Sequence, residues 1–319
     1  RESVNTYSKY LSIRSTAVYG GARIHNQRLK LRKGVDVLVA TPGRLLDLYN
    51  QKAVNFKNIE LFVLDEADQM LDMGFIHDIK KIANLLPDRR QNLMFTATFS
   101  NPFRKLAKEM ADKAIEISVT TDGEAGENIE HYCHPVDKSR KAELLIELIE
   151  TQNWDQALVF TRTKHGADRL QKQLEKVEIS AKAIHGNKTQ NNRMKALDAF
   201  KNNRVKILVA TDVAARGIDI KKMSQVINFD VPTVAKDYIH RIGRTGRGGD
   251  KGKAITLVSA DEFRLLSDIE KLLGQKLERV EIEGFEPEHV VPAKEKQKPK
   301  NKKFHNRGGF KNRRRSRKG

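Results

Sequence analysis

The sequence predicts an α/β protein built on parallel sheets. Short apolar segments alternate with segments of helical period, charged or hydroxyl residues follow the apolar segments, and the two halves of the chain repeat this pattern. Strands that alternate with helices form parallel sheets, and such sheets bind ligands beyond the carboxyl ends of their strands. The side chains that follow the predicted strands are therefore the candidate site residues.

The first half of the chain shows the alternation up to residue 118. Its apolar runs predict strands at 16–19, 35–40, 61–64, 93–95 and 115–118. Apolar residues at helical spacing predict a helix over residues 75–86, which Pro87 ends, and an amphipathic helix at the start of the chain. The run at 61–64 is apolar at every position, so we expect it to be buried on both faces.

Residues 119–128 are polar and lack apolar period, which predicts a linker between two domains. The second domain has predicted strands at 157–160, 181–184, 206–210, 226–229 and 254–258, and predicted helices at 141–150, 165–176, 191–202 and 264–273. The expected organisation is a first domain over 1–118, a second over 129–286 and a tail over 287–319.

The two halves resemble each other in detail. The segment 35–41 (VDVLVAT) matches 205–211 (VKILVAT), and Tyr19-Gly20-Gly21 precedes the first at about the interval at which Ile184-His185-Gly186 precedes the second. Unrelated buried strands share similar sequences by chance, but two matched elements in the same order favour a duplicated domain.

The charge of the chain indicates a polyanionic partner. Lys and Arg number 60 against 41 Asp and Glu, a net charge of +19, and residues 294–319 hold thirteen of these basic residues against one Glu. This composition predicts a disordered basic tail. Phe304, Phe310 and the Arg307-Gly308-Gly309 step favour RNA contact through charge and stacking, although such a tail can also be a solubilising segment.

Other features exclude several classes of protein. The single cysteine, Cys133, rules out an internal disulfide and favours a reducing, cytoplasmic location. No apolar run is long enough for a membrane helix, and the scattered histidines form no zinc pattern. The chain opens at Arg1 without Met, inside a predicted helix, so we expect a fragment whose true N-terminus is missing.

The acidic cluster Asp65-Glu66-Ala67-Asp68 directly follows the apolar run at 61–64. Carboxylates that gather at a sheet edge suit Mg²⁺, which takes one or two of them together with waters and substrate phosphates. We expect Asp65 to hold a hydrated Mg²⁺ and Glu66 to orient or deprotonate an attacking water. The alternative is a solvated acidic turn.

A second polar cluster places Arg241, Arg244 and Arg247 among glycines. Arginine forks match phosphate oxygens, and an arginine of this kind can stabilise a transferring phosphoryl group. A solvated basic loop or a generic RNA patch remains an alternative. Asp219, after the strand that ends near residue 210, could bind a ribose hydroxyl or cap a turn.

Several short motifs follow one another through residues 16–260. They are Gly20-Gly21, Thr41-Pro42-Gly43-Arg44, Asp65-Glu66-Ala67-Asp68, Thr96-Ala97-Thr98, Val159-Phe160-Thr161-Arg162-Thr163, Gln190-Asn191-Asn192-Arg193, 210–219 and 240–247. In kind and order they resemble the motifs of the DEAD-box ATP-dependent RNA helicases of superfamily 2, with wording most like the bacterial RhlE-type subgroup.

The resemblance implies two RecA-like domains, the first incomplete here, that use ATP and Mg²⁺ and bind single-stranded RNA. It implies catalytic roles for Asp65, Glu66, Arg244 and Arg247. The implied nucleotide-binding residues are Asp68, Gly217 and Asp219, and the implied coupling residues are Thr96, Thr98 and His240. The implied contacts with RNA sugar-phosphate are Gly21, Thr41, Arg44, Thr163, Arg193 and Thr211. Domain closure would bend the RNA strand, and ATP hydrolysis would release it.

Three departures from the family pattern matter. Thr96 stands where the family usually has serine, and Gln69 where related sequences often have arginine. The phosphate-cradling G-x-x-x-x-G-K-[ST] motif is absent from the 319 residues, the nearest match being Gly252-Lys253-Ala254. The Q motif and motif Ia are also absent and belong upstream of Arg1. We therefore expect an ATPase in the parent protein and an inactive fragment.

Two alternatives stay open at this point. One is a non-catalytic RNA-binding or annealing protein that acts through its basic tail and RNA-facing groove. The other is a DNA helicase of the same superfamily, which the wording of the motifs makes less favourable.

Overall fold

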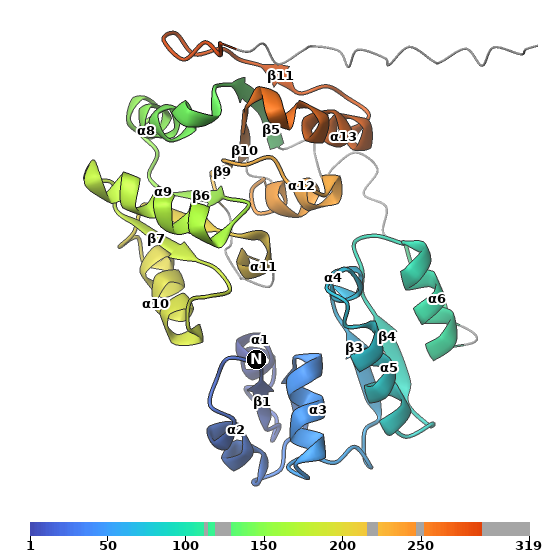
Figure 1. The fold of residues 1–319 in the computed structure, drawn as a ribbon. Helices are drawn as coiled ribbons and strands as arrows, with labels where there is room; N and C mark the ends of the chain where they lie inside the picture. Colours follow the sequence, from blue (N-terminus) through green and yellow to red (C-terminus); the bar gives the residue numbers. More distant parts are fainter. Residues whose placement is uncertain (112–113, 119–128, 216–222, 247–251, 289–319) are drawn as a thin grey trace, which may run out of the picture. The chain divides into compact units, whose positions relative to one another are not determined.

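The structure, a computed structural model, describes residues 1–111, 114–118, 129–215, 223–246 and 252–288. The chain divides into two compact units, of which unit 1 is Arg1–Asp122 with Lys188–Met194 and unit 2 is Gly123–Asn187 with Lys195–Gly319. Figure 1 shows the helices and strands of both units. Each unit is described by itself.

Unit 1 carries two separate pairs of parallel strands. Its elements are α1 (Glu2–Tyr7), β1 (Ser15–Val18), α2 (Ile24–Leu31), β2 (Val37–Ala40), α3 (Pro42–Asn50), β3 (Leu61–Leu64), α4 (Ala67–Asp72), α5 (Ile76–Leu85), β4 (Gln91–Met94) and α6 (Asn101–Met110). Strand β1 pairs with β2, and β3 pairs with β4. The parallel pairing and the helix predicted over 75–86 are confirmed.

The core around β3 and β4 is built by three helices. Leu64 at the end of β3 packs with Ala67 of α4, Ile79 of α5, and Phe103 and Leu106 of α6. Ser100 caps helix α6, since its hydroxyl accepts a hydrogen bond from the Phe103 amide, and Pro102 suits the first turn of the helix. These helices fix the loops that leave the carboxyl ends of β3 and β4.

Two expectations for unit 1 were wrong. Strand β3 is not buried on both faces, because the side chains of Leu61 and Val63 are 52% and 46% exposed. Leu61 and Val63 are two residues apart and lie on the same face of the strand, so that face has no covering layer among the described residues. Residues 115–118 form no strand, and Ile115 and Ile117 are exposed.

Unit 2 is a seven-stranded sheet in which every pairing is parallel. The strand order is β11-β5-β10-β9-β6-β8-β7. The strands are β5 (Ile129–Pro135), β6 (Ala157–Phe160), β7 (Ala181–Ile184), β8 (Ile207–Ala210), β9 (Gln225–Asn228), β10 (Gly252–Val258) and β11 (Glu278–Arg279). Five of them were predicted. Strand β5 was missed because its sequence, IEHYCHP, mixes polar residues into the run.

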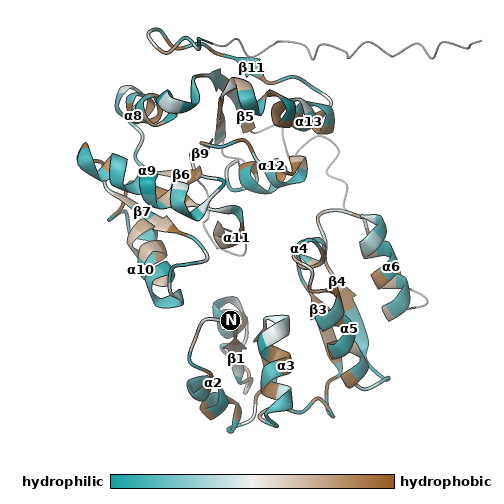
Figure 2. Ribbon diagram, viewed as in Figure 1, coloured by the Kyte–Doolittle hydropathy of each residue, from teal (hydrophilic) through white to brown (hydrophobic). Residues whose placement is uncertain are grey.

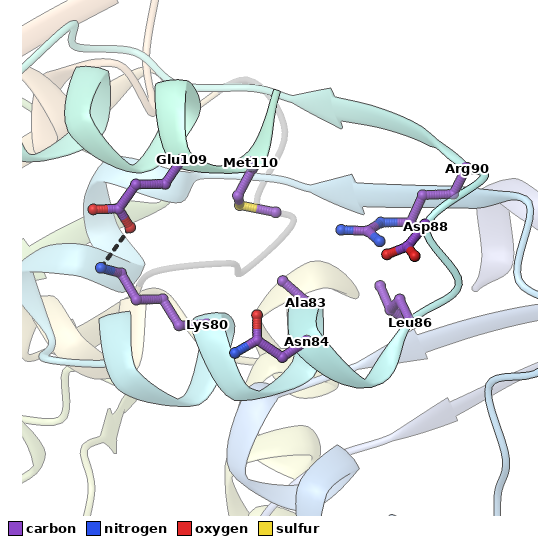
Figure 3. A pocket seen from close by; sticks show the side chains of 8 residues that line it. All are labelled: Lys80, Ala83, Asn84, Leu86, Asp88, Arg90, Glu109 and Met110. Atoms are coloured by element: carbon purple, nitrogen blue, oxygen red, sulfur yellow. Dashed lines mark ion pairs between the residues drawn. The ribbon is translucent and has the colours of Figure 1, made fainter. Parts of the chain in front are cut away.

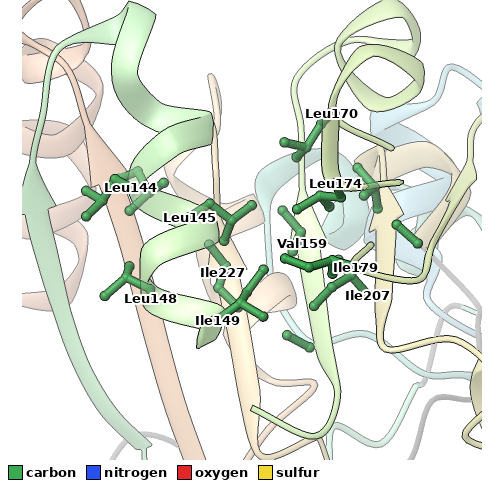
Figure 4. Packing of buried hydrophobic residues seen from close by; sticks show 14 of the residues in the cluster. Leu144, Leu145, Leu148, Ile149, Val159, Leu170, Leu174, Ile179, Ile207 and Ile227 are labelled. Atoms are coloured by element: carbon green, nitrogen blue, oxygen red, sulfur yellow. The ribbon is translucent and has the colours of Figure 1, made fainter. Parts of the chain in front are cut away.

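Helices cover the sheet of unit 2. They are α8 (Lys141–Thr151), α9 (Lys164–Lys176), α10 (Gln190–Lys201) from Lys195 on, α11 (Asp212–Ala215), α12 (Ala235–Ile242) and α13 (Phe263–Leu273), with short 3₁₀ turns η1 (Lys138–Arg140) and η2 (Ala260–Glu262). Figure 4 shows Leu145 and Ile149 of α8 and Leu174 of α9 packed over Val159 of β6. Strands β6 and β8 are buried at every position, so both faces of this sheet are covered.

The pairing of the strands agrees with the predicted duplication. Residue Val18 pairs with Ala40 at the ends of β1 and β2, and Ile184 pairs with Ala210 at the ends of β7 and β8. The two matched sequence segments therefore occupy the same register in two parallel pairs. The polar residues that follow each pair are placed in equivalent positions, one set in each unit.

Candidate functional site

The acidic turn after β3 has a strained backbone. Glu66 lies in the left-handed region at φ 50° and ψ 45°, and its amide donates to Asp65 Oδ1 at 2.9 Å. A non-glycine residue pays roughly 1–2 kcal/mol for this conformation. The turn leaves Asp65 and Glu66 exposed while Ala67 and Asp68 are buried. Two carboxylates are thus presented to solvent at the carboxyl end of a strand.

The third carboxylate of the turn faces inward, toward the segment after β4. Asp68 Oδ2 accepts hydrogen bonds from the Thr98 amide at 3.0 Å and the Thr98 hydroxyl at 2.9 Å. The Thr96 hydroxyl donates to the Thr98 carbonyl at 2.9 Å. The structure therefore brings 65–68 and 96–98 together, as expected for the ends of neighbouring parallel strands, and fixes Asp68 at 4% exposure.

The exposed pair suits a hydrated Mg²⁺ bound with phosphates. No group of three or more His, Cys, Asp and Glu residues capable of holding a metal occurs among the described residues. A full protein cage is not required, because Mg²⁺ keeps several waters and takes one or two carboxylates beside substrate phosphates. Asp65 can provide that carboxylate, and Glu66 lies next to it in the chain.

Two loops meet beside the ends of β1 and β2. The Thr41 amide donates to the Val18 carbonyl at 3.1 Å, and Arg44 Nη1 donates to the Ala22 carbonyl at 3.0 Å. Gly21, which precedes Ala22, has φ +75°, a backbone angle that residues with an L side chain rarely adopt. Gly21 and Thr41 are exposed, so the Gly21 backbone and the Thr41 hydroxyl are accessible to a ligand. The guanidinium of Arg44 is held beside them by the Ala22 carbonyl.

In unit 2 the corresponding edge is formed by the ends of β6 and β8. The Thr161 amide donates to the Ala210 carbonyl at 2.9 Å, which aligns the residues after both strands. Thr163 caps α9, since its hydroxyl accepts from the Gly166 amide at 2.9 Å. A Cβ on Gly166 would lie 3.1 Å from that hydroxyl. Thr163 is exposed, and Thr211 is half-buried.

The remaining predicted site residues lie on or beside helices α10 and α12, or outside the described residues. Arg193 is half-buried in the first turn of α10, where its Nη1 donates to Gln190 Oε1 at 3.3 Å. His240 and Arg244 are half-buried, in α12 and just after it. Gly217, Asp219 and Arg247, and the predicted tail from residue 289 on, lie outside the described residues.

Sequence reasoning missed two buried charge networks in unit 2. Arg241, treated above as one of three phosphate-facing arginines, is 2% exposed and binds both carboxylate oxygens of Asp212. Lys141, also buried, binds Glu262, which in turn accepts from Arg162 Nη2 at 2.5 Å. Only the helical spacing of Arg241 with Tyr238 and Ile242, both buried, could have indicated that it faces inward.

A cavity of about 490 Å³ in unit 1 is unrelated to these residues. Figure 3 shows it between the Lys80–Glu109 ion pair and Arg90 with Asp88. Arg90 precedes β4, so the cavity lies at the amino end of that strand, whereas the acidic turn lies at the carboxyl end of its neighbour. None of the predicted site residues lines it.

Two further observations concern the rest of the chain. Burial raises the pKa of the Cys133 thiol to about 12, so this cysteine is a packing residue and no nucleophile. Among the described helices, none is long and apolar enough to span a bilayer.

The comparisons with known proteins agree with this geometry. A family model described as DEAD/DEAH box helicase matches residues 1–122, and one described as helicase conserved C-terminal domain matches residues 140–249. The structure is similar to that of S. cerevisiae Dbp5 bound to RNA and ADP BeF3, at 34% identity and a TM-score of 0.78, over 88% of this chain and 73% of that one. The chain belongs to the DEAD-box RNA helicase family.

This DEAD-box chain has close bacterial relatives. It is 40% identical over 280 residues to the DEAD-box ATP-dependent RNA helicase CshA of Bacillus cereus (strain ATCC 10987 / NRS 248), covering 88% of this chain and 53% of CshA. It is 37% identical over 309 residues to the ATP-dependent RNA helicase DbpA of Bacillus subtilis (strain 168), covering 95% of this chain and 64% of DbpA. The chain thus spans about half the length of CshA.

Membership of the DEAD-box family confirms the predicted fold class. The two units, each with parallel strands, correspond to two RecA-like domains. In unit 2, helices cover both faces of the seven-stranded sheet. In unit 1, the two strand pairs are separate among the described residues.

Proposed function

We propose that the protein encoded by the complete gene is an ATP-dependent RNA helicase, or RNA clamp, that couples ATP hydrolysis to RNA binding and local duplex unwinding. The observation that supports this most strongly is the acidic turn. Asp65 and Glu66 are exposed at a strand end, while Asp68 is sequestered by Thr98. A pure RNA-binding protein has no need of two adjacent exposed carboxylates.

The nucleotide chemistry is assigned to residues of both units. Asp65 would hold a hydrated Mg²⁺, which neutralises charge on the ATP phosphates. Glu66 orients or deprotonates the attacking water, and the left-handed backbone holds its carboxylate in the exposed turn. Arg244 and Arg247 stabilise charge on the transferring phosphoryl group. Additional nucleotide contacts are assigned to Gly217 and Asp219. Asp68, which the resemblance also implied as a nucleotide contact, is 4% exposed and bound by Thr98, so it is assigned a positioning role in the turn.

The RNA contacts are assigned to the loops after the strands. These residues are Gly21, Thr41, Arg44, Thr163, Arg193 and Thr211. They offer hydroxyls, backbone amides and guanidinium groups, which suit sugar and phosphate and carry no base-specific information. Binding is therefore expected to be independent of sequence and sensitive to salt. Thr96, Thr98 and His240 couple nucleotide state to RNA binding.

A second function is favoured by one observation. The 319 residues contain no G-x-x-x-x-G-K-[ST] motif, whose backbone and lysine cradle ATP phosphates. A chain limited to these residues would act as an RNA-binding or annealing protein without turnover. We also propose the RhlE-type subgroup and a cytoplasmic location, on the motif wording and the single buried cysteine. The domain bounds 1–118 and 129–286, with a linker and a basic tail, complete the proposal.

The deciding experiment measures ATP turnover with and without RNA. It uses the protein encoded by the complete gene and its Glu66→Gln variant, with DNA as a second activator. RNA-dependent turnover that disappears in the Gln variant supports the helicase. RNA binding without turnover favours the annealing protein, and equal activation by DNA favours a DNA helicase.

A further inference from the structure

Helix α9 exposes a row of basic residues on its outermost face. The residues are His165, Arg169, Lys172 and Lys176, and all four are exposed. Their spacing of four, three and four residues keeps them on one side of a helix with 3.6 residues per turn. We name these four residues the α9 stripe. Figure 2 shows hydrophilic residues along the visible side of α9.

The opposite face of α9 explains why the stripe points outward. Ala167, Leu170 and Leu174 are buried in the core of unit 2 against the sheet. This packing fixes the rotation of the helix about its own axis. The stripe therefore lies on solvent as a consequence of the fold, and it cannot turn inward.

The acidic residues of α9 lie beside the stripe and have other partners. Asp168 Oδ1 lies 3.0 Å from Nε2 of the buried His185. Glu175 Oε1 accepts from Gln171 at 2.9 Å and from Lys182 at 3.3 Å. Among the described residues, no ion pair involves Arg169, Lys172 or Lys176. Their positive charge is thus left uncompensated along one line.

The stripe begins where an RNA contact is proposed. His165 is two residues beyond Thr163, the cap of α9 that is assigned to sugar-phosphate. From His165 to Lys176 the helix rises by roughly 16 Å, at 1.5 Å per residue. A polyanion bound at the amino end of α9 has a continuous cationic track along the rest of the helix.

We propose that the α9 stripe binds the phosphates of an RNA segment that flanks the one bound by the motif loops. This inference rests on the proposed RNA binding and extends it to a longer RNA. Charge complementarity and continuity with Thr163 favour RNA over an acidic protein as the partner. Removing the side chain that neutralises one phosphate of a single strand lowers the salt slope of binding by about 0.7.

The test compares two oligouridylates, a short one that fills only the motif loops and a longer one that extends past them. The variant Arg169→Gln/Lys172→Gln/Lys176→Gln removes three charges from the stripe. A matched control, Arg264→Gln/Lys271→Gln/Lys276→Gln, removes three exposed charges on and beside α13. Affinity is measured by fluorescence anisotropy over a range of salt, with thermal unfolding as a check of folding.

The stripe variant should bind the longer RNA more weakly, with a salt slope about 2 smaller, and bind the short RNA like the wild type. The control variant should retain most of the affinity and slope for both. Equal losses in the two variants, or an unchanged affinity for the longer RNA, overturn the proposal. Binding of poly-glutamate through these residues in place of RNA overturns it in favour of an acidic protein. A wild-type chain that binds neither RNA refutes the proposed RNA binding itself.

Discussion

Arg241 and Asp212 are joined by two parallel hydrogen bonds, from Nε to Oδ1 at 2.6 Å and from Nη2 to Oδ2 at 2.8 Å. The remaining guanidinium nitrogen, Nη1, donates to Asn228 Oδ1 at 3.0 Å and to the Asp230 carbonyl at 2.8 Å. The pair connects α12 with α11 and with the loop after β9. It therefore ties together two of the motifs, 210–219 and 240–247.

The Asp212→Ala variant should destabilise unit 2 by about 3 kcal/mol, because Arg241 would keep its charge in a buried site without a counter-ion. The measurement is urea unfolding followed by the fluorescence of Trp154. This residue is the only tryptophan of the chain and is buried in the core of unit 2, so its signal reports that unit.

The matched control is Arg204→Ala. Arg204 pairs with Asp198 at 2.5 Å, but both side chains are more than half exposed, so its loss should cost less than about 1 kcal/mol. Equal losses in the two variants would contradict the structural role assigned to Arg241.

Lys141 and Glu262 should behave as a coupled pair. Lys141 also donates to the Phe229 and Leu257 carbonyls, and Glu262 accepts from the Val231 amide. Glu262→Leu alone leaves the buried Lys141 without its counter-ion and should lower the free energy of unfolding of unit 2 by about 3–5 kcal/mol. The double variant Lys141→Met/Glu262→Leu should recover part of this loss, because it removes both buried charges together. Additive losses on Trp154 unfolding would show that the two residues act independently.

Asp261 should make the stability of unit 2 depend on pH in the acid range. Hydrogen bonds from Lys138 and Ser259 lower the pKa of its carboxyl to about 2, below the ordinary value of 3.8. The folded state therefore binds fewer protons than the unfolded state between these values. The resulting stability is present above about pH 4 and is lost as the pH falls through about 2.

The Asp261→Asn variant should lose this contribution at neutral pH, by no more than about 1 kcal/mol since the ion pair with Lys138 is exposed. Its unfolding free energy should approach that of the wild type as the pH falls toward 2. A constant difference between the two proteins from pH 7 to pH 2 would disprove the assignment.

Thr98 should stabilise the acidic turn through its hydroxyl. The Thr98→Val variant removes the donor to Asp68 and keeps the amide hydrogen bond, so α4 should open more easily by about 1.5 kcal/mol. Native-state hydrogen exchange of the α4 amides measures this opening. Thr6→Val, which removes a hydroxyl of the exposed helix α1, is the control and should leave α4 unchanged.

The basic tail should contribute to RNA affinity through charge. Deletion of residues 294–319 removes thirteen basic residues and one Glu, so RNA binding should weaken and its salt slope should become smaller. Anisotropy measurements at several salt concentrations test this. A slope equal to that of the intact chain would refute a role for the tail in RNA binding.

Local sequence was sufficient for many elements and motif positions. The run at 157–160, and residues 207–210 of the run predicted at 206–210, are apolar throughout and form the buried strands β6 and β8. The run at 61–64 looks the same in sequence, yet β3 exposes Leu61 and Val63. The apolar pattern of a segment predicts a strand, but it does not show whether a second layer covers that strand. Strand β11, two residues long, gave no periodic signal at all.

The sequence by itself determined the parallel α/β class, the two matched halves, and the exposed polar residues that follow the strands, such as Glu66 and Thr163. These features depend on short-range spacing, which a chain displays before it folds. Tertiary structure alone decided which charges face inward. Asp68 is bound by Thr98, thirty residues away, and Arg241 by Asp212, twenty-nine residues away. Burial of a charge is possible only where a partner from elsewhere in the chain offsets its desolvation, and that partner is set by packing.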